Sequence, residues 1–120
     1  MSGLGGVLLF LAGAALIWWV FGRGNPAGEA ALELVREGAL ILDVRTPVEF
    51  AAGHVRGARN VPVDQLGVRL AELGDPGPVV VYCATGARSA RATSVLKAAG
   101  FDVVDVGRFS AFPPEMRQEP

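Results

Sequence analysis

Charge is distributed unevenly along this chain, which limits how much of it can fold in water. All 23 charged side chains lie at or beyond Arg23, and residues 3–21 are 15 hydrophobic residues and four glycines. As a helix rising about 1.5 Å per residue, that run spans roughly 28 Å, close to the hydrocarbon thickness of a bilayer. Trp18 and Trp19 near its end are typical of a membrane interface. We therefore predict a single transmembrane helix within residues 1–22, with residues 3–21 in contact with the lipid bilayer.

Two other interpretations of this segment are a cleaved signal peptide and a buried core helix. A signal peptide has a basic start, a shorter apolar run and a small-residue cleavage site. Here no Lys or Arg precedes the run, and bulky residues 18–21 stand where cleavage is expected. An uncleaved anchor is therefore favoured. Because Arg23 and Arg36 follow the run, the positive-inside rule predicts a single-pass protein whose C-terminal domain is cytoplasmic.

About 90 residues remain for folding, enough for one small hydrophobic core. The glycines, asparagine and proline of residues 23–28 predict a linker, residues 29–112 a single domain, and residues 113–120 a flexible tail. A net charge of −1 gives no basic field for nucleic acid, so no nucleic-acid partner is expected. One cysteine and one histidine argue against a disulfide framework and a zinc site.

Helical and strand patterns alternate along the domain. Strands are predicted at 39–44, 58–61, 79–83 and 101–106, and helices at 29–37, 47–52, 64–73 and 89–99. Thr46 and Glu49 form a predicted capping box, and Asp64 is a predicted N-cap. The alternation predicts an α/β fold with one mostly parallel sheet and helices on both faces. In such sheets ligands bind beyond the C-terminal ends of the strands.

Cys83 lies at one of these strand ends, before a short loop and a helix. Its sulfur is predicted to face backbone N–H groups and the positive end of the helix, with Arg88 beside it. This arrangement favours the nucleophilic thiolate. Gly86 is expected to adopt a positive φ and Ser89 to cap the helix. The alternatives are that Cys83 is a small buried hydrophobe and Arg88 a solvated side chain. However, a cation at a helix N-terminus indicates an anion between them.

Two long segments, Leu42–Pro62 and Val80–Ser89, closely resemble the signatures of the rhodanese-like sulfurtransferases, and Ala98–Phe112 resembles a third, weaker one. The resemblance covers about residues 29–112 and implies a single rhodanese-like domain. The chain has Arg108 where the family usually has a second glycine, and Phe112 where it usually has tryptophan. Both positions are expected to affect packing rather than chemistry.

The resemblance implies persulfide chemistry at Cys83 as the catalytic residue. Cys83 would take sulfane sulfur from thiosulfate or a persulfide donor and pass it to a thiol, cyanide or a protein acceptor. Arg88 would bind the anionic donor or the departing sulfite. The backbone N–H groups expected to stabilise the anionic sulfur belong to the loop residues Ala84, Thr85, Gly86, Ala87 and Ser89. This scheme needs no metal and no organic cofactor.

Other residues of the first signature are given structural roles. Asp43 and Arg45 are expected to form an ion pair or loop hydrogen bonds near the site. His54 is expected to be structural because the family does not use it as a base and sulfur transfer has little need of one. Arg56 and Arg59 could add positive potential near the site, although exposed arginines usually have no specific role.

Two rival functions remain. Cysteine phosphatases and arsenate reductases related to this fold have five residues between cysteine and arginine, whereas four separate Cys83 from Arg88. The shorter loop suits a sulfur atom better than a whole oxyanion. The second rival is a non-catalytic binding or sensing module with the same fold. Inactive relatives typically lose the cysteine, which this chain keeps.

Overall fold

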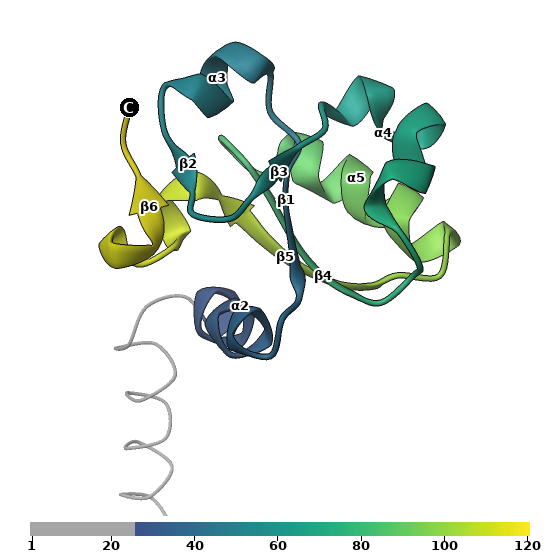
Figure 1. Cartoon of the computed structure of the whole chain (residues 1–120), viewed down its shortest axis with the longest axis horizontal. Helices are drawn as coiled ribbons and strands as arrows, with labels where there is room; N and C mark the ends of the chain where they lie inside the picture. The colour runs from purple at the N-terminus through teal and green to yellow at the C-terminus, as the bar shows by residue number, and fades with distance from the viewer. Residues whose placement is uncertain (1–25) are drawn as a thin grey trace, which may run out of the picture.

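The computed structural model describes residues 26–120, and its central element is a four-stranded parallel sheet in the order β3-β1-β4-β5 (Figure 1). The strands are β1 (Leu40–Asp43), β3 (Arg59–Asn60), β4 (Pro78–Cys83) and β5 (Asp102–Arg108). All three neighbouring pairs run parallel. The predicted α/β fold with a mostly parallel sheet is confirmed.

β4 lies at the centre of the molecule because its residues are apolar on both sides. Residues 79–83 are all 0% exposed. Side chains alternate between the faces of a strand. Val79, Val81 and Cys83 accordingly belong to one core cluster, while Val80 and Tyr82 belong to the other. The uninterrupted apolar run in the sequence thus reflects a strand that is covered on both faces.

Helices cover both faces of the sheet, as predicted. One face packs against α4 (Val63–Arg69), the 3₁₀ turn η1 (Leu70–Leu73) and α5 (Ala87–Ala98), which bury Leu66 and Leu96. The other packs against α2 (Pro26–Arg36), which lies on the opposite side of the sheet in Figure 1, and against the 3₁₀ turn η2 (Phe109–Ala111). The remaining helix, α3 (Pro47–Ala51), follows β1 at the upper edge of the view.

Helices α2 and α4 do not begin where the sequence predicts. Helix α2 begins at Pro26, so residues 26–28 are not linker. Proline is well suited to the first turn of a helix, and the burial of Gly28 and Ala31 fixes this turn against the sheet. Asp64 is not an N-cap: Pro62 occupies that position without a side-chain cap, and Asp64 lies in the first turn of α4. The helix predicted to reach Leu73 changes to 3₁₀ geometry at its last four residues.

The prediction of a flexible tail is wrong for residues 114–118. These residues form the 3₁₀ turn η3 (Pro114–Met116) and β6 (Arg117–Gln118), which pairs antiparallel with β2 (His54–Val55). The backbone N–H of Arg56 donates to the carbonyl of Met116 at 2.8 Å. Met116 also packs against the core on the α2 side. The segment is ordered because β2 offers it backbone partners that its own composition does not reveal.

The predicted transmembrane helix lies in residues 1–22, outside the described part of the chain. Within residues 26–120, no helix is both long enough and apolar enough to cross a bilayer.

Candidate active site

Cys83 is the last residue of β4, and its sulfur is held by the loop that follows. The backbone N–H of Gly86 donates to Cys83 Sγ at an N–S distance of 2.9 Å. Gly86 has φ of +107° and is the N-cap of α5, so the predicted positive φ is confirmed. This conformation turns the chain sharply enough for an N–H three residues ahead to point back at the sulfur. The thiol thus faces a helix N-terminus, where a negative charge is favoured.

Opposing effects set the acidity of this thiol, and the balance favours the thiolate. Burial raises the pKa of Cys83, but hydrogen bonding to the sulfur, led by the backbone N–H groups of Ser89, Gly86 and Thr85, outweighs it. The net result is a pKa below the usual value for cysteine. Because the thiolate is the nucleophilic form, the loop prepares Cys83 for attack on an electrophilic atom.

Ser89 is not the helix cap that the sequence predicts. The helix begins two residues earlier, at Ala87, because Gly86 in its left-handed conformation sets the turn. Ser89 is fully buried, and its hydroxyl donates to the carbonyl of Gly86 at 3.0 Å. The same oxygen lies 3.4 Å from the carbonyl of Gly107 in β5. Ser89 therefore fastens the cysteine loop to the neighbouring strand.

Arg88 is not free beside the sulfur but paired with Glu49. Its Nη1 and Nη2 atoms donate to Oε1 and Oε2 of Glu49 at 2.7 and 2.9 Å. The hydrogen bond to Glu49 raises the pKa of Arg88, and the charge of Cys83 adds to that shift. The cation and the sulfur therefore belong to one electrostatic site.

The sequence predicts only a capping role for Glu49, and the structure adds the contact with Arg88. The capping box is confirmed: the Glu49 N–H donates to Thr46 Oγ1 at 3.2 Å, and the Thr46 N–H donates to Glu49 Oε1 at 3.1 Å. The hydrogen bond from Arg88 lowers the pKa of Glu49 to about 2. The contact forms because the loops after the neighbouring parallel strands β1 and β4 meet at the same edge of the sheet, a pairing of strands that the sequence alone does not give.

The sequence predicts an ion pair or loop hydrogen bonds for Asp43 and Arg45, and the structure shows an ion pair that is buried. Arg45 Nη2 lies 2.7 Å from Asp43 Oδ2 and also donates to the carbonyl of Gly53 at 2.6 Å. Its guanidinium carbon lies 4.8 Å from the ring centroid of Phe109 and 5.5 Å from that of Tyr82. The pair joins β1 to the segment after α3, and so supports the helix that carries Glu49.

The remaining sequence candidates lie on other contacts. His54 stacks on Phe50 with ring centroids 3.8 Å apart, and its Nδ1 is 2.9 Å from the Phe50 carbonyl oxygen. Arg59 donates to the backbone carbonyl of Glu72 at 2.6 Å. Among residues 26–120, no three His, Cys, Asp or Glu side chains gather closely enough to hold a metal ion.

The other predicted site residues, Ala84, Thr85 and Ala87, lie in the loop between Cys83 and α5 or at the first residue of that helix. Ala84 and Thr85 are exposed and precede Gly86, while Ala87 is the first residue of α5. The structure therefore brings the loop, Cys83 and Arg88 together at the C-terminal edge of the sheet.

Comparison with known proteins agrees with this geometry. The family model for the rhodanese-like domain matches residues 27–108. This chain belongs to the rhodanese-like family. It is similar to a thiosulfate sulfurtransferase, GlpE of Pseudomonas putida, with 39% identity over 99 residues that cover 75% of this chain and 88% of GlpE.

Two further similar proteins differ in how much of their length is matched. The protein YqhL of Bacillus subtilis is 45% identical over 62 residues, which cover 52% of this chain. The match spans about half of YqhL, 49% of its length. A solved rhodanese with anions from E. coli has 28% identity and a TM-score of 0.60, covering 69% of this chain and all of that one.

Proposed function

We propose that this protein is a sulfurtransferase that carries sulfane sulfur as a persulfide on Cys83. The observation that carries the proposal is the hydrogen bond of 2.9 Å from the Gly86 N–H to Cys83 Sγ. Packing in the core does not require this hydrogen bond, whereas a nucleophilic thiolate is stabilised by it. The similarity to a thiosulfate sulfurtransferase supports the same reaction.

In the first half-reaction, the Cys83 thiolate attacks the outer sulfur of thiosulfate. The S–S bond of thiosulfate breaks, sulfite leaves with the bonding electron pair, and the outer sulfur stays on Cys83 as a persulfide anion. In the second half-reaction, an acceptor thiolate or cyanide attacks that terminal sulfur and Cys83 leaves as the thiolate. Neither half-reaction requires a proton transfer. The reaction therefore needs no general base, and His54 can be held in its contacts with Phe50 without loss of activity.

The loop supplies the electrostatic part of this mechanism. The terminal sulfur of the persulfide is anionic, and the N–H groups of residues 84–89 lie at the N-terminus of α5, which favours negative charge. Arg88 contributes the cation of the site, for the anionic donor or the departing sulfite. These roles make the loop a stabiliser of the intermediate rather than a binder of a whole tetrahedral oxyanion.

The test is the intact mass of the full-length protein, purified in detergent, after treatment with thiosulfate. We expect a gain of one sulfur atom that a reductant removes, and no gain in the Cys83→Ser variant. Cyanide added to the loaded protein should release thiocyanate. A folded wild-type protein that gains no sulfur from thiosulfate or from a small-molecule persulfide would refute the proposal.

We also propose that residues 1–22 anchor the protein as a single-pass membrane protein with a cytoplasmic domain. The support is the charge-free run of the sequence and the two arginines, Arg23 and Arg36, that follow it. The test uses a Cys83→Ser background with Gly24→Cys as the only thiol. We expect an impermeant thiol reagent to label this cysteine only after the cells are opened. Labelling in intact cells would contradict the orientation, and recovery in the soluble fraction would contradict the anchor.

A further inference from the structure

Glu49 is paired with the guanidinium of Arg88, the group that is expected to bind an anionic donor. Two Nη atoms of Arg88 are bound by the two carboxylate oxygens of Glu49, at 2.7 and 2.9 Å. A planar guanidinium binds oxyanions through such paired contacts. A sulfonate-like group on a donor would form the same kind of paired contacts with this Nη1–Nη2 edge. The donor and Glu49 therefore compete for Arg88.

Glu49 is a well-anchored competitor because α3 holds its carboxylate in place. Oε1 accepts from both the backbone N–H and the hydroxyl of Thr46, at 3.1 and 3.0 Å, in addition to Arg88. The side chains of Glu49 and Arg88 are 32% and 31% exposed, so solvent screens the pair only in part. The pKa of Glu49 lies at about 2, chiefly because of the hydrogen bond from Arg88, so the carboxylate stays charged near neutral pH.

The ion pair between Glu49 and Arg88 changes the net charge that a donor encounters as it approaches Cys83. Glu49 neutralises Arg88, the cation whose pKa responds to the charge of Cys83. Thiosulfate brings two negative charges toward a thiolate and a carboxylate, and like charges at short range repel. The reacting group of a thiol persulfide carries at most one negative charge. The electrostatic penalty is therefore larger for thiosulfate than for a persulfide.

We propose that Glu49 is a positioning residue that restrains Arg88 and makes the site prefer persulfide donors to thiosulfate. The inference rests on the proposed persulfide chemistry of Cys83. In the preferred reaction the Cys83 thiolate attacks the terminal sulfur of R–S–SH and the donor S–S bond breaks. The thiolate R–S⁻ leaves with the bonding electron pair, and Cys83 carries the S–SH group. Charge is conserved, and neither an oxidant nor a reductant is consumed.

The test compares Glu49→Gln with the wild-type full-length protein, using thiosulfate and cysteine persulfide as donors. Glutamine keeps an acceptor for the capping box but removes the charge that restrains Arg88. We expect the KM for thiosulfate to fall about fivefold, the size of one partly exposed ion pair, with kcat changed by less than about twofold. The KM for cysteine persulfide should change by less than about twofold.

A matched control is Glu72→Gln, which removes the same charge from another carboxylate–arginine pair. Glu72 contacts Arg69 at 2.7 and 2.9 Å at the end of α4, a helix that carries no residue of the proposed site. This variant should leave both KM values unchanged, which separates a local effect from a change in overall charge.

The outcomes distinguish this inference from the function on which it rests. If both proteins load sulfur on Cys83 but the ratio of the two KM values is the same in Glu49→Gln and wild type, the inference is wrong. It is also wrong if the KM for thiosulfate rises in the variant, since Glu49 would then be helping Arg88 to bind the donor. If neither donor loads Cys83 in the wild-type protein, the proposed function fails, and the inference with it.

Discussion

Replacing Gly86 with alanine should both destabilise the domain and weaken the thiolate. Gly86 has φ of +107°, a conformation that residues with a Cβ avoid at a cost of about 1–2 kcal/mol. Space is not the obstacle, because the nearest heavy atom to an added Cβ is the Cα of Gly107 at 3.8 Å, an ordinary contact. We therefore expect Gly86→Ala to lose about 1–2 kcal/mol of unfolding free energy through backbone strain.

The same change should be visible in the chemistry of Cys83. A backbone that relaxes from φ of +107° moves the Gly86 N–H away from the sulfur, 2.9 Å from it in the native loop. Losing this hydrogen bond should raise the pKa of Cys83, because the bond favours the charged form. The rate of alkylation by iodoacetamide, measured across pH, should therefore have its midpoint at a higher pH than in the wild type.

Gly67→Ala provides the matched control. Gly67 lies inside α4 with no atom within 4 Å of an added Cβ and no positive φ. Alanine there should leave the alkylation profile unchanged and add about 0.5–1 kcal/mol of stability. If Gly86→Ala is as stable as the wild type in urea and shows the same alkylation midpoint, the loop does not act on the thiol as argued.

Three further predictions concern groups around the site. Asp43→Asn leaves the buried Arg45 without its carboxylate and should cost about 3–5 kcal/mol of unfolding free energy in urea; a loss below about 1 kcal/mol would show that Arg45 reaches solvent instead. Tyr82→Phe removes the hydroxyl that accepts from the Val55 N–H at 2.9 Å and should cost about 1–3 kcal/mol, whereas an unchanged urea midpoint would mean that this N–H finds another partner. The pKa of Glu49 is lowered from 4.5 to about 2 in the folded protein, so its ion pair stabilises the fold above about pH 4.5, and this contribution is lost as the pH falls toward about 2. Glu49→Gln should flatten the fall in unfolding free energy across that window, and an identical fall in the variant would contradict the assignment.

Features fixed by local sequence were predicted well, and features fixed by contacts between distant segments were not. The capping box at Thr46 and the positive φ of Gly86 depend on a few neighbouring residues, and both are confirmed. The two misplaced N-caps, Asp64 and Ser89, are also local features, but in each case an earlier residue, Pro62 or Gly86, takes the N-cap position. Ser89 is a good capping residue on its own, yet Gly86 turns the chain first and leaves Ser89 inside the helix.

The pairing of Glu49 with Arg88 shows where the sequence stops being informative. The two residues are 39 positions apart, and each has a sufficient local role without the other. Only the three-dimensional meeting of the loops after β1 and β4 joins them. The same holds for β6, whose partner β2 lies more than 60 residues earlier in the chain. Its short polar sequence gives no sign of order until that partner is in place.

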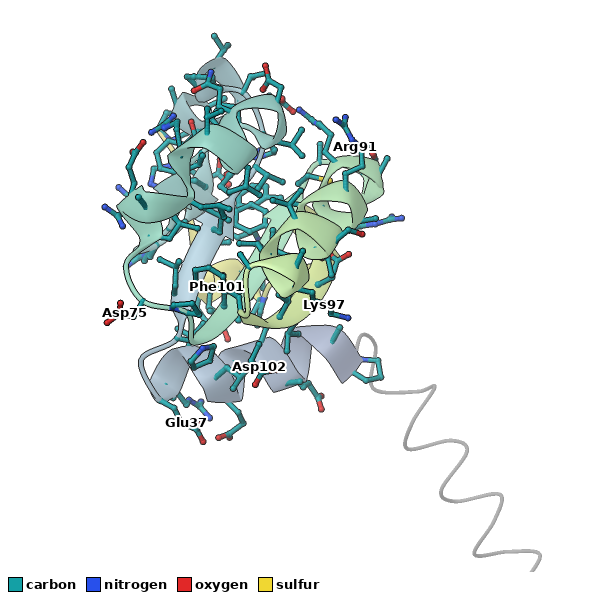
Figure 2. The ribbon with its side chains drawn as sticks, turned by 90° about the vertical axis from the view of Figure 1, so that its right-hand side faces the viewer. Glu37, Asp75, Arg91, Lys97, Phe101 and Asp102 are labelled. Carbon is teal, nitrogen blue, oxygen red and sulfur yellow. The ribbon has the colours of Figure 1, made fainter. Side chains whose placement is uncertain are left out.

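The placement of α2 has a consequence for how this domain is presented to other molecules. In Figure 2, α5 runs downward from Arg91 to Lys97. Helix α2, which ends just before Glu37, lies below it, near Asp102 at the start of β5. The chain therefore enters the fold through α2, on the face of the sheet opposite α5. A tether through the N-terminal segment would lie on the other side of the sheet from α5, the helix that follows the cysteine loop, and would leave that side open to a large sulfur donor or acceptor. A tether added after Pro120 would instead crowd the side of the molecule where β6 and α3 lie (Figure 1).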